Sequence, residues 1–291
     1  MIVSIPTTNR PEVVVPTVLN IARQTRLPDL LLIVIASEKD IDPIAIENMP
    51  FPVSIIVSER GLTTQRNAAL ETLKSDDLLL FLDDDFVMAP DYLANLERLF
   101  LDNPEVAMAT GTVLADGIHG PGLTHRFGQD LASRGKPRKL DKQKLQDVYN
   151  CYGCNMSLRA KHVVAQQIRF DQRLKMYGWL EDVDFSRQMA KFGRIVESQS
   201  LVGVHLGTKT GRSNGFNLGY SQVANPFYLN GKGTMAPLRA MNIVGRNLFS
   251  NLARSLYPEP EIDRWGRLKG NFKALGDLIR GRLKPERILE F

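Results

Sequence analysis

The sequence predicts an α/β fold in which a mostly parallel, Rossmann-like sheet is flanked by helices. Two apolar runs, residues 30–36 and 78–82, have the length of strands and no polar alternation, as expected for strands buried on both faces. Polar, turn-forming residues follow each run, and segments with the helical spacing of apolar residues lie between them. This alternation of strand and helix is typical of the βαβ units that build a parallel sheet.

The remaining elements follow from the same patterns. Thr8 or Asn9 can cap the helix after the first strand, and Pro11 suits its first turn. The predicted strands are residues 3–6, 30–36, 53–57, 78–82, 106–114 and 201–206, and the predicted helices are residues 12–24, 61–73, 90–101, 178–192, 237–257 and 262–283. Residues 115–147 are polar and rich in glycine, and we expect them to form a long excursion from the sheet.

Composition suits an ordinary globular protein. The chain has 291 residues, of which 43% are hydrophobic and 24% charged. This length accommodates one large domain, expected at residues 1–224, and a helical extension at residues 225–291. No stretch approaches the length of an apolar membrane span, the first residues lack the pattern of a signal peptide, and two cysteines are too few for a disulfide framework. We therefore expect a cytoplasmic protein without a membrane span.

The net charge of +5 is unevenly distributed along the chain. Residues 225–291 hold 12 Lys and Arg against 6 Asp and Glu, so the surplus of positive charge lies in the tail. A nucleic-acid site would be expected to place basic residues around a cleft or along a recognised motif. We therefore expect no nucleic-acid partner.

Three consecutive carboxylates, Asp83, Asp84 and Asp85, follow the strand at residues 78–82. They are expected at the carboxyl end of a parallel sheet, where open α/β sheets bind their ligands. Adjacent negative charges repel one another, so a positive partner is expected, and Mg²⁺ is usually held by one or two carboxylates together with substrate phosphates. The alternative is a solvated acidic turn that only ends the strand, although one Asp or Asn is enough for a turn.

Three short segments resemble the successive signatures of family 2 glycosyltransferases, which are inverting enzymes with the GT-A fold. These segments are residues 4–11 (Ser-Ile-Pro-Thr-Thr-Asn-Arg-Pro), 65–69 (Gln-Arg-Asn-Ala-Ala) and 81–85 (Phe-Leu-Asp-Asp-Asp). The resemblance implies that residues 1–224 form a catalytic domain that uses a nucleotide-diphosphate sugar and Mg²⁺ or Mn²⁺. It implies a donor site that contains Pro6, Thr7, Thr8, Arg10, Arg66, Asp83, Asp84 and Asp85. Within this site, Asp83 and Asp85 would be the Asp-x-Asp pair that binds ribose and metal.

One departure from the family pattern concerns the nucleotide base. The second strand of family members usually runs into an acidic pair, but here it is followed by Ala36, Ser37 and then Glu38. The usual partner of a uracil ring is therefore absent from its expected place. UDP, GDP and dTDP donors stay open, as does a shifted acidic contact through Glu38 or Asp40.

A C-x-x-C pair, Cys151 and Cys154, raises the question of a zinc or redox site. Structural zinc needs four ligands, and no second pair follows. The segment that starts at Gly153 instead resembles the family's Gly-x-Asn-Met segment. The resemblance implies that Gly153 and Asn155 line the sugar and acceptor side of the site.

A second acidic cluster lies at the predicted start of a helix. Glu181 and Asp184 are explained by the favourable interaction of carboxylates with the helix dipole. This explanation leaves Asp182 free, and an Asp near an aromatic residue such as Trp179 is suited to receive the proton of a sugar hydroxyl. The resemblance to the family's Glu-Asp motif implies that Asp182 is the general base, with Trp179 and Glu181 on the acceptor side.

The predicted strand at residues 201–206 contains His205. A lone His in an apolar strand is either a core residue or, as the resemblance implies, a third metal ligand. The following loop, residues 207–215, is basic and rich in glycine. Lys209 and Arg212 in this loop can supply charge to the phosphates of the donor when the loop closes.

The last predicted helix is amphipathic and basic. Its apolar residues, spaced by three and four, are Trp265, Leu268, Phe272, Leu275 and Ile279. Such a helix is suited to lie at an anionic membrane surface, and the alternative is that the stripe packs on the catalytic domain or on another subunit. With the tail on the inner face of the plasma membrane, the hydroxyl acceptor would be a polyprenyl-diphosphate-linked glycan in bacterial surface polysaccharide synthesis.

The predicted function is inverting transfer of a sugar from a nucleotide-diphosphate donor to a hydroxyl acceptor. Two other functions stay open at this point. A sugar nucleotidyltransferase also uses carboxylate-bound Mg²⁺, but would want a glycine-rich basic loop after the first strand, where this chain has Thr7, Thr8, Asn9 and Arg10. An inactive scaffold or carbohydrate-binding protein that kept the fold is the third possibility.

Overall fold

The computed structural model describes residues 1–134, 145–209 and 214–291. The chain divides into two compact units. Unit 1 comprises Met1–Arg60, Thr64–Arg169 and Gln188–Gly211, and unit 2 comprises Gly61–Thr63, Phe170–Arg187 and Arg212–Phe291. The predicted boundary between residues 224 and 225 falls inside one continuous helix, α7 (Gly215–Lys232). The division into domains of residues 1–224 and 225–291 stays a prediction.

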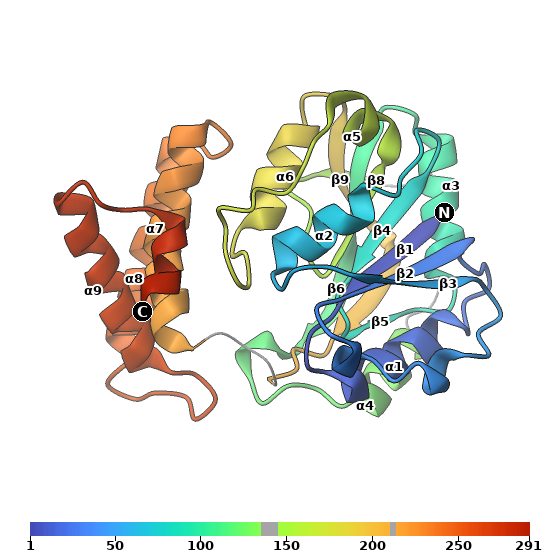
Figure 1. Cartoon of the computed structure of the whole chain (residues 1–291), viewed down its shortest axis with the longest axis horizontal. Coiled ribbons are helices and arrows are strands. Elements are labelled where there is room, and N and C mark those ends of the chain that lie inside the picture. Colours follow the sequence, from blue (N-terminus) through green and yellow to red (C-terminus); the bar gives the residue numbers. More distant parts are fainter. Residues whose placement is uncertain (135–144, 210–213) are drawn as a thin grey trace. The chain divides into compact units, whose positions relative to one another are not determined.

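The described part of unit 1 is built on a nine-stranded sheet with the order β3-β2-β1-β4-β8-β6-β9-β5, in which β7 pairs with β9 (Figure 1). The strands are β1 (Ile2–Pro6), β2 (Leu30–Ile35), β3 (Val53–Val57), β4 (Leu78–Leu82), β5 (Phe86–Met88), β6 (Val106–Asp116), β7 (Gln146–Asp147), β8 (Asn155–Arg159) and β9 (Arg194–His205). The α/β class expected from the sequence is confirmed.

The first half of the sheet is parallel. Strands β3, β2, β1 and β4 pair in this order with parallel registers. Every residue of β1 is buried, as are all but the first of β2 and of β4. These strands lack polar alternation because both faces of the sheet are covered. Their carboxyl ends lie along one edge of the sheet.

The second half of the sheet is mixed. Strand β8 lies between β4 and β6 and runs antiparallel to both. Strands β6 and β9 are parallel with several register shifts, while β5 is antiparallel to β9. The sequence pattern missed β5, which has three residues, and β8, whose sequence Asn-Met-Ser-Leu-Arg resembles a half-exposed strand although four of its residues are buried.

Several helices lie between the strands in sequence. They are α1 (Pro11–Ile21), α2 (Leu62–Leu70), α3 (Tyr92–Asp102), α4 (His125–Arg134), α5 (Ala160–Gln166) and α6 (Glu181–Met189). Of these, α2 and α6 run across the division between the units. Helices α4 and α5 were not predicted, and α4 lies in the segment expected to be an irregular excursion. Its Gly128 packs against Leu206 and Val87, where a Cβ would be too close to both side chains.

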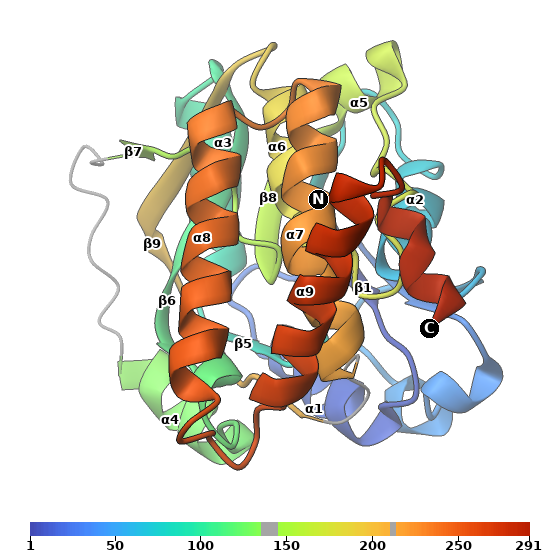
Figure 2. The same ribbon diagram turned by 90° about the vertical axis from the view of Figure 1, so that its left-hand side faces the viewer.

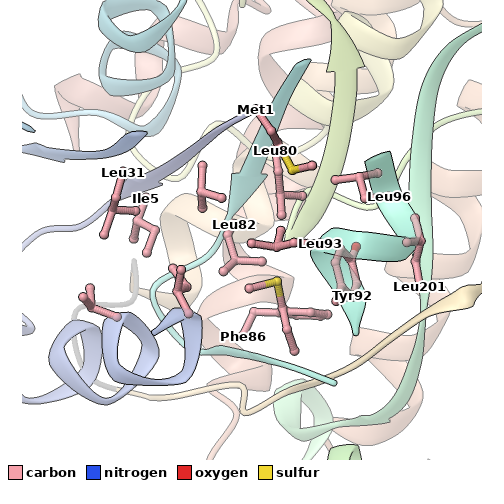
Figure 3. Packing of buried hydrophobic residues seen from close by; sticks show 14 of the residues in the cluster. Met1, Ile5, Leu31, Leu80, Leu82, Phe86, Tyr92, Leu93, Leu96 and Leu201 are labelled. Carbon is pink, nitrogen blue, oxygen red and sulfur yellow. The ribbon is translucent and has the colours of Figure 1, made fainter. Parts of the chain in front are cut away.

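The main hydrophobic core of unit 1 lies between the sheet and its helices. Side chains of β1 and β4, such as Ile5 and Leu80, belong to one cluster with those of α3, such as Leu93 and Leu96 (Figure 3). These residues have little or no exposed surface. Burying a Leu or Ile side chain contributes about 1.5–3 kcal/mol, so this packing fixes the strands that end at the three carboxylates.

Unit 2 contains a group of helices, α7 (Gly215–Lys232), α8 (Pro237–Arg254) and α9 (Arg264–Ile279), followed by the short helix η4 (Pro285–Glu290) (Figure 2). A Cβ on Gly219 would overlap the backbone of Arg267, and one on Gly270 would overlap the backbone of Phe216. Glycine therefore allows α7 and α9 to approach closely, which explains its presence inside a helix despite its low helix propensity.

A buried polar network ties these helices together. The Asn251 side chain on α8 donates to Gln222 on α7 at 2.8 Å and to Asn271 on α9 at 2.9 Å. Asn271 in turn donates to the carbonyl oxygen of Gly219 at 2.7 Å. Because buried polar groups are costly unless paired, this network specifies one arrangement of the helices within unit 2.

Helix α7 was not predicted, because its interior contains Gly219 and Pro226. Its ends carry the usual signals all the same. Asn214 caps the first turn by accepting from the amide of Asn217 at 2.8 Å, and Gly233 adopts a left-handed conformation after the last turn. Across all described helices, none is both long and apolar enough to cross a membrane.

Candidate active site

The end of β4 places the first acidic cluster. The amide of Asp83 donates to the carbonyl oxygen of Cys154 at 3.1 Å, and the amide of Phe86 donates to that of Asp83 at 3.1 Å, which closes a tight turn between β4 and β5. Phe86 is paired with His205 in the ladder between β5 and β9. This pairing brings His205, far away in sequence, next to the three carboxylates.

Asp83, Asp85 and His205 form a group that could hold a metal ion. Nε2 of His205 lies 3.3 Å from Oδ1 of Asp85 and 3.9 Å from Oδ2 of Asp83. One ligand atom from each of the three residues lies within 4.8 Å of the other two. Among residues 1–134, 145–209 and 214–291, this is the group of three or more metal-binding side chains with that geometry. All three residues were predicted metal ligands.

The close carboxylates and imidazole change one another's ionisation. Burial by itself would lower the pKa of His205, but hydrogen bonds to Asp116 and Asp85 and the charges of Asp85 and Asp83 raise it to about 10. Burial opposes ionisation of Asp85, yet His205, Arg10 and the amide of Thr208 lower its pKa to about 2. A proton on His205 therefore balances the carboxylates, and a divalent cation would do so with more charge.

The second edge of the His205 ring faces a residue that sequence analysis missed. Oδ1 of Asp116, the last residue of β6, lies 2.9 Å from Nδ1 of His205. The hydroxyl of Tyr152 donates to Oδ2 of Asp116 at 2.8 Å. In the sequence, Asp116 lies 89 residues before His205, and nothing in the local pattern marks it. Only the register of β6 against β9 shows the connection.

Asp84 is a buried anchor rather than an exposed ligand. It has 1% of its surface exposed, accepts a hydrogen bond from the Thr7 hydroxyl at 2.7 Å and lies 3.2 Å from the Arg10 guanidinium. Burial raises its pKa to about 7 despite the charge of Arg10. Its carbonyl oxygen accepts from Thr17 of α1 at 2.6 Å. We therefore assign Asp84 to holding the end of β1 and α1 against the acidic turn.

Arg66 is almost completely buried and fixes two parts of the site. Its guanidinium donates to the carbonyl oxygen of Gly153 at 2.8 Å and to Oδ1 of Asp83 at 3.2 Å, and it lies 5.5 Å from the ring centroid of Phe81. Burial raises the pKa of Asp83 although the charge of Arg66 opposes this. Arg66 and Gly153 thus lie beside the metal-capable cluster, where Arg66 positions Asp83.

Asn155 was expected on the acceptor side, but it lies inside the protein. Its side chain has no exposed surface, accepts from the Thr110 hydroxyl and exchanges hydrogen bonds with the backbone of Gly111. These bonds connect β8 to β6 in the interior of the sheet. In this conformation Asn155 serves strand pairing, and its predicted acceptor-side role stays a prediction.

The end of β1 lies beside β2, on the side expected to bind the nucleotide. Pro6 ends the strand, Thr7 is buried, and Thr8 is partly exposed with its hydroxyl 3.4 Å from Gln65. Gln65 holds this segment by donating to the carbonyl oxygens of Thr7 at 2.9 Å and Val34 at 2.8 Å. In the sequence, Gln65 stands out only as part of the signature at residues 65–69, and its role in holding this segment is visible only in the structure.

Asp40 was one of two carboxylates considered as a shifted partner for the base. It has no exposed surface, and its carboxylate accepts from the amides of Asn9 at 2.7 Å, Ala36 at 2.8 Å and Ser37 at 2.9 Å. It thereby joins the loops that follow β1 and β2. A base contact through Asp40 is excluded in this conformation, while Glu38 beside it is exposed.

The segment after β9 is attached to the acidic cluster through its backbone. The amide of Thr208 donates to Oδ2 of Asp85 at 2.7 Å. The ammonium of Lys209 donates to the carbonyl oxygens of Gly117 at 3.1 Å and Ile118 at 2.9 Å. Lys209 was predicted to bind donor phosphates, and in this conformation it stabilises the neighbouring short helix η3 (Gly117–His119). Arg212 lies outside the described residues.

Trp179, Glu181 and Asp182 belong to unit 2. Asp182 is partly exposed in the first turn of α6, and its Oδ1 accepts from the amide of Val183 at 2.7 Å. Glu181 is buried and Trp179 is partly exposed, with its carbonyl oxygen bound by Asn225 at 2.7 Å. Asp184 is fully buried and bound by Thr234 and Lys232. The position predicted for the base is therefore accessible, whereas Asp184 holds unit 2 together.

The C-x-x-C pair takes no part in the metal-capable cluster. Cys151 and Cys154 form no disulfide bond, and both are buried. That the pair binds no zinc stays a prediction.

Solved structures support the fold. TarS residues 1–349 from S. aureus, in complex with UDP-GlcNAc, match with a TM-score of 0.53 and 17% identity over 99% of this chain and 82% of that one. The mannosyltransferase PcManGT from Pyrobaculum calidifontis, in complex with GDP-Man and Mn²⁺, matches with a TM-score of 0.56 and 16% identity over 95% of this chain and 86% of that one. This chain covers 44% of a longer TarS structure. At these identities the likeness concerns the GT-A fold.

Curated protein sequences give no match to this chain. The comparison with protein families does give one, to the family described as Glycosyl transferase family 2, over residues 2–164. This match covers more than half of the chain and includes β1, the acidic turn after β4 and Gly153. The chain therefore belongs to glycosyl transferase family 2.

Proposed function

We propose that this glycosyltransferase moves a sugar, with inversion, from a nucleotide-diphosphate donor to a hydroxyl acceptor. The main support is the convergence of Asp83, Asp85 and His205 at the carboxyl end of the sheet, with their ligand atoms within 4.8 Å of one another. Parallel α/β sheets bind ligands at this edge. A buried and a half-buried carboxylate beside one imidazole suit a ligand that brings a cation and phosphates together.

The donor set fits a divalent ion of the Mg²⁺ or Mn²⁺ type. Carboxylate oxygens suit Mg²⁺ and Mn²⁺, and the added imidazole nitrogen of His205 favours Mn²⁺ of the two. A likeness supports this choice, since the mannosyltransferase with the same fold was solved with GDP-Man and Mn²⁺. Bound between Asp83, Asp85 and His205, the ion would neutralise charge that develops on the departing diphosphate.

Residues beside the cluster would hold the rest of the donor. Thr8 and Arg10 are partly exposed after β1, and Thr7 and Pro6 shape the backbone there. Lys209 could exchange its carbonyl partners for phosphate oxygens when the donor binds, together with Arg212. UDP, GDP and dTDP donors all stay open for this chain. Structures with this fold carry UDP-GlcNAc in one case and GDP-Man in another.

Asp182 is our candidate for the general base that takes the acceptor proton. It starts α6 after a loop with unusual backbone, since Met176 (φ 58°), Gly178 (φ 65°) and Leu180 (φ 74°) all adopt left-handed conformations. Such strain in residues other than glycine costs about 1–3 kcal/mol each and is concentrated at functional sites. With Trp179 and Glu181 beside it, this loop is suited to present Asp182 to a sugar hydroxyl.

A screen of nucleotide sugars tests the donor proposal without knowledge of the acceptor. We expect slow hydrolysis of one UDP-, GDP- or dTDP-sugar that requires Mn²⁺ or Mg²⁺, and its loss in Asp85→Ala. The matched control is Asp76→Ala, which removes an exposed carboxylate before the same strand. Metal-independent turnover, or full activity of Asp85→Ala, would contradict the proposal.

Helices α8 and α9 expose apolar side chains that suit a membrane surface. On α9, Leu268 is buried while Trp265, Phe272 and Ile279 are exposed by 53%, 56% and 88%. The apolar stripe predicted for this helix is therefore partly packed inside the protein and partly exposed as an apolar edge. Helix α8 adds exposed Leu238 and Phe249, and it carries three Arg and no Asp or Glu.

Exposed apolar residues next to arginines suit a surface of anionic lipids, where each basic residue contributes about 1 kcal/mol. We propose that α8 and α9 bind the inner face of the plasma membrane from the cytoplasm. The acceptor would then be a polyprenyl-diphosphate-linked glycan or a growing polysaccharide of the bacterial surface.

Sedimentation with vesicles tests this surface. We expect binding to vesicles that contain phosphatidylglycerol, weaker binding to pure phosphatidylcholine, and loss of binding in Trp265→Ser/Phe272→Ser. Phe127→Ser, which removes an exposed aromatic residue of α4, is the control. Equal sedimentation of both variants would count against α9 as a membrane contact.

A further inference from the structure

The parallel pair β6 and β9 contains an irregularity next to the candidate metal site. Val113 pairs with Gly203, so regular pairing would set Ala115 beside His205. The register shifts by one residue after Val113, and Asp116 pairs with His205 instead. An extra residue of this kind is a β-bulge, a device that re-aims side chains near active sites. Here it replaces a methyl group beside His205 with a carboxylate.

The carboxylate of Asp116 is held from several directions. Its Oδ1 lies 2.9 Å from Nδ1 of His205 and accepts from the amide of Ile118 at 3.0 Å. Its Oδ2 accepts from the hydroxyl of Tyr152 at 2.8 Å. A carboxylate can only accept from the imidazole, so Nδ1 of His205 donates to Asp116. Nε2 is the nitrogen that faces Asp85 and Asp83, where a metal ion would take the place of a proton.

Tyr152 is fixed in turn. Its amide donates to the Thr110 hydroxyl at 3.2 Å, and its ring meets the His205 ring edge to face, with centroids 5.9 Å apart and planes at 86°. Tyr152 therefore touches His205 through its ring and Asp116 through its hydroxyl. Both contacts oppose rotation of the imidazole.

We propose that Asp116, held by Tyr152, is the positioning residue that fixes the tautomer and orientation of His205 as a metal ligand. The inference rests on the proposed metal site and adds two residues to it that do not contact the ion. Ligating histidines commonly donate their second nitrogen to a carboxylate, which orients the ring and increases its basicity. Asp116 lies at the Nδ1 edge, opposite Nε2, so it acts through His205 and not as a further ligand.

Binding of Mn²⁺ to the full chain, followed by electron paramagnetic resonance of the free ion, tests the proposal without turnover. Loss of such an outer partner typically weakens metal binding about 10- to 100-fold, so we expect this loss for Asp116→Ala. Asp116→Asn keeps an acceptor for Nδ1 without its charge and should bind better than Asp116→Ala. Tyr152→Phe, which removes one oxygen atom, should weaken binding less than either.

Asp147→Asn is the matched control, because Asp147 lies on β7, also beside β9, and pairs with Arg194 on the surface. Thermal unfolding of each variant is measured alongside. Wild-type affinity in Asp116→Ala and Tyr152→Phe, or an equal loss in Asp147→Asn, would overturn the inference. If Asp116→Ala does not fold, Tyr152→Phe and Asp116→Asn decide. A wild-type protein that binds no Mn²⁺ would instead refute the metal site itself.

Discussion

The two acidic clusters of the chain use their carboxylates in the same divided way. In the cluster of unit 1, Asp84 is buried, accepts from a threonine hydroxyl at 2.7 Å and faces Arg10. In the cluster of unit 2, Asp184 is buried, accepts from Thr234 at 2.7 Å and faces Lys232 at 2.8 Å. In each cluster, one carboxylate is buried and stabilises the fold of its own unit.

The clusters differ in what the remaining carboxylates do. Asp83 and Asp85 converge on one imidazole, with Nε2 of His205 within 4 Å of both. Asp182 is partly exposed and starts a helix behind a strained loop. One cluster therefore has a geometry that could hold a cation, and the other presents a partly exposed carboxylate. In each acidic motif, one carboxylate is bound inside the fold, and the candidates for ligand binding or catalysis are among the others.

The largest expected effect separates Asp182 from its neighbours. Asp182→Asn should lower sugar transfer by about 10²- to 10⁴-fold, the usual contribution of a general base, while the Kd of the donor is unchanged. Transfer rates and donor titration, measured on the same preparation, check this. An unchanged transfer rate would show that Asp182 is not the general base and, like Asp184, has at most a role in the fold.

Asp184 should matter for stability more than for chemistry. Replacing it with Ala removes the acceptor that lies 2.7 Å from the Thr234 hydroxyl, which then keeps a long contact of 3.5 Å to the carbonyl oxygen of Leu229. It also removes one of two partners of Lys232, which keeps Asp171 at 2.7 Å. We expect the free energy of unfolding to fall by about 3 kcal/mol, the lower end for breaking a buried pair. Urea denaturation measures this. A variant as stable as the wild type would show that the two clusters are not alike.

The role of Asp84 in unit 1 can be tested by removing the Thr7 hydroxyl that donates to it. Thr7→Val keeps the shape of the side chain and leaves Oδ2 of Asp84 without its donor. The cost of an unsatisfied buried acceptor is about 1–3 kcal/mol, so we expect a loss in this range by the same denaturation. The control is Thr8→Val, whose hydroxyl makes a long contact of 3.4 Å on a partly exposed residue.

The smallest expected effect is on stability at acid pH, through Asp171. Burial of Asp171 opposes its ionisation, but hydrogen bonds from Lys232 and Tyr228 lower its pKa below the ordinary 3.8. Its folded form therefore binds the proton less readily than its unfolded form, and its contribution to stability is complete above about pH 4 and is lost as the pH falls through the lowered pKa. Asp171→Asn should flatten this part of the stability curve. An identical acid limb in the variant would contradict the assignment.

Much of the first half of the fold could be predicted from sequence, because buried parallel strands such as Leu78–Leu82 are continuous apolar runs that end in polar turns. The three candidate metal ligands were found by resemblance, and the structure brings them together. Features that depend on register could not be found. Asp116 meets His205 only because β6 carries a bulge, and a bulge leaves no mark on hydrophobic periodicity.

Burial explains the remaining differences between the sequence pattern and the structure. Asp40, Asp84 and Asn155 are polar, and polarity suggests exposure or ligand binding. All three are buried and bonded within the protein, where they join loops or strands. Helix α7 escaped prediction for a related reason, since its Gly219 weakens a helix in isolation but allows close contact with α9.

The place of β8 affects how the chain is made on the ribosome. Strands β1 to β4 leave the exit tunnel in sequence and can pair in parallel, but β4 has an open hydrogen-bonding edge until residue 159 has emerged. Unpaired strand edges invite association with other chains. If the chain folds as it emerges, β4, which carries the acidic turn, joins the edge strand β3 in exposing an unpaired edge, and pairing with β8 ends that stage for β4.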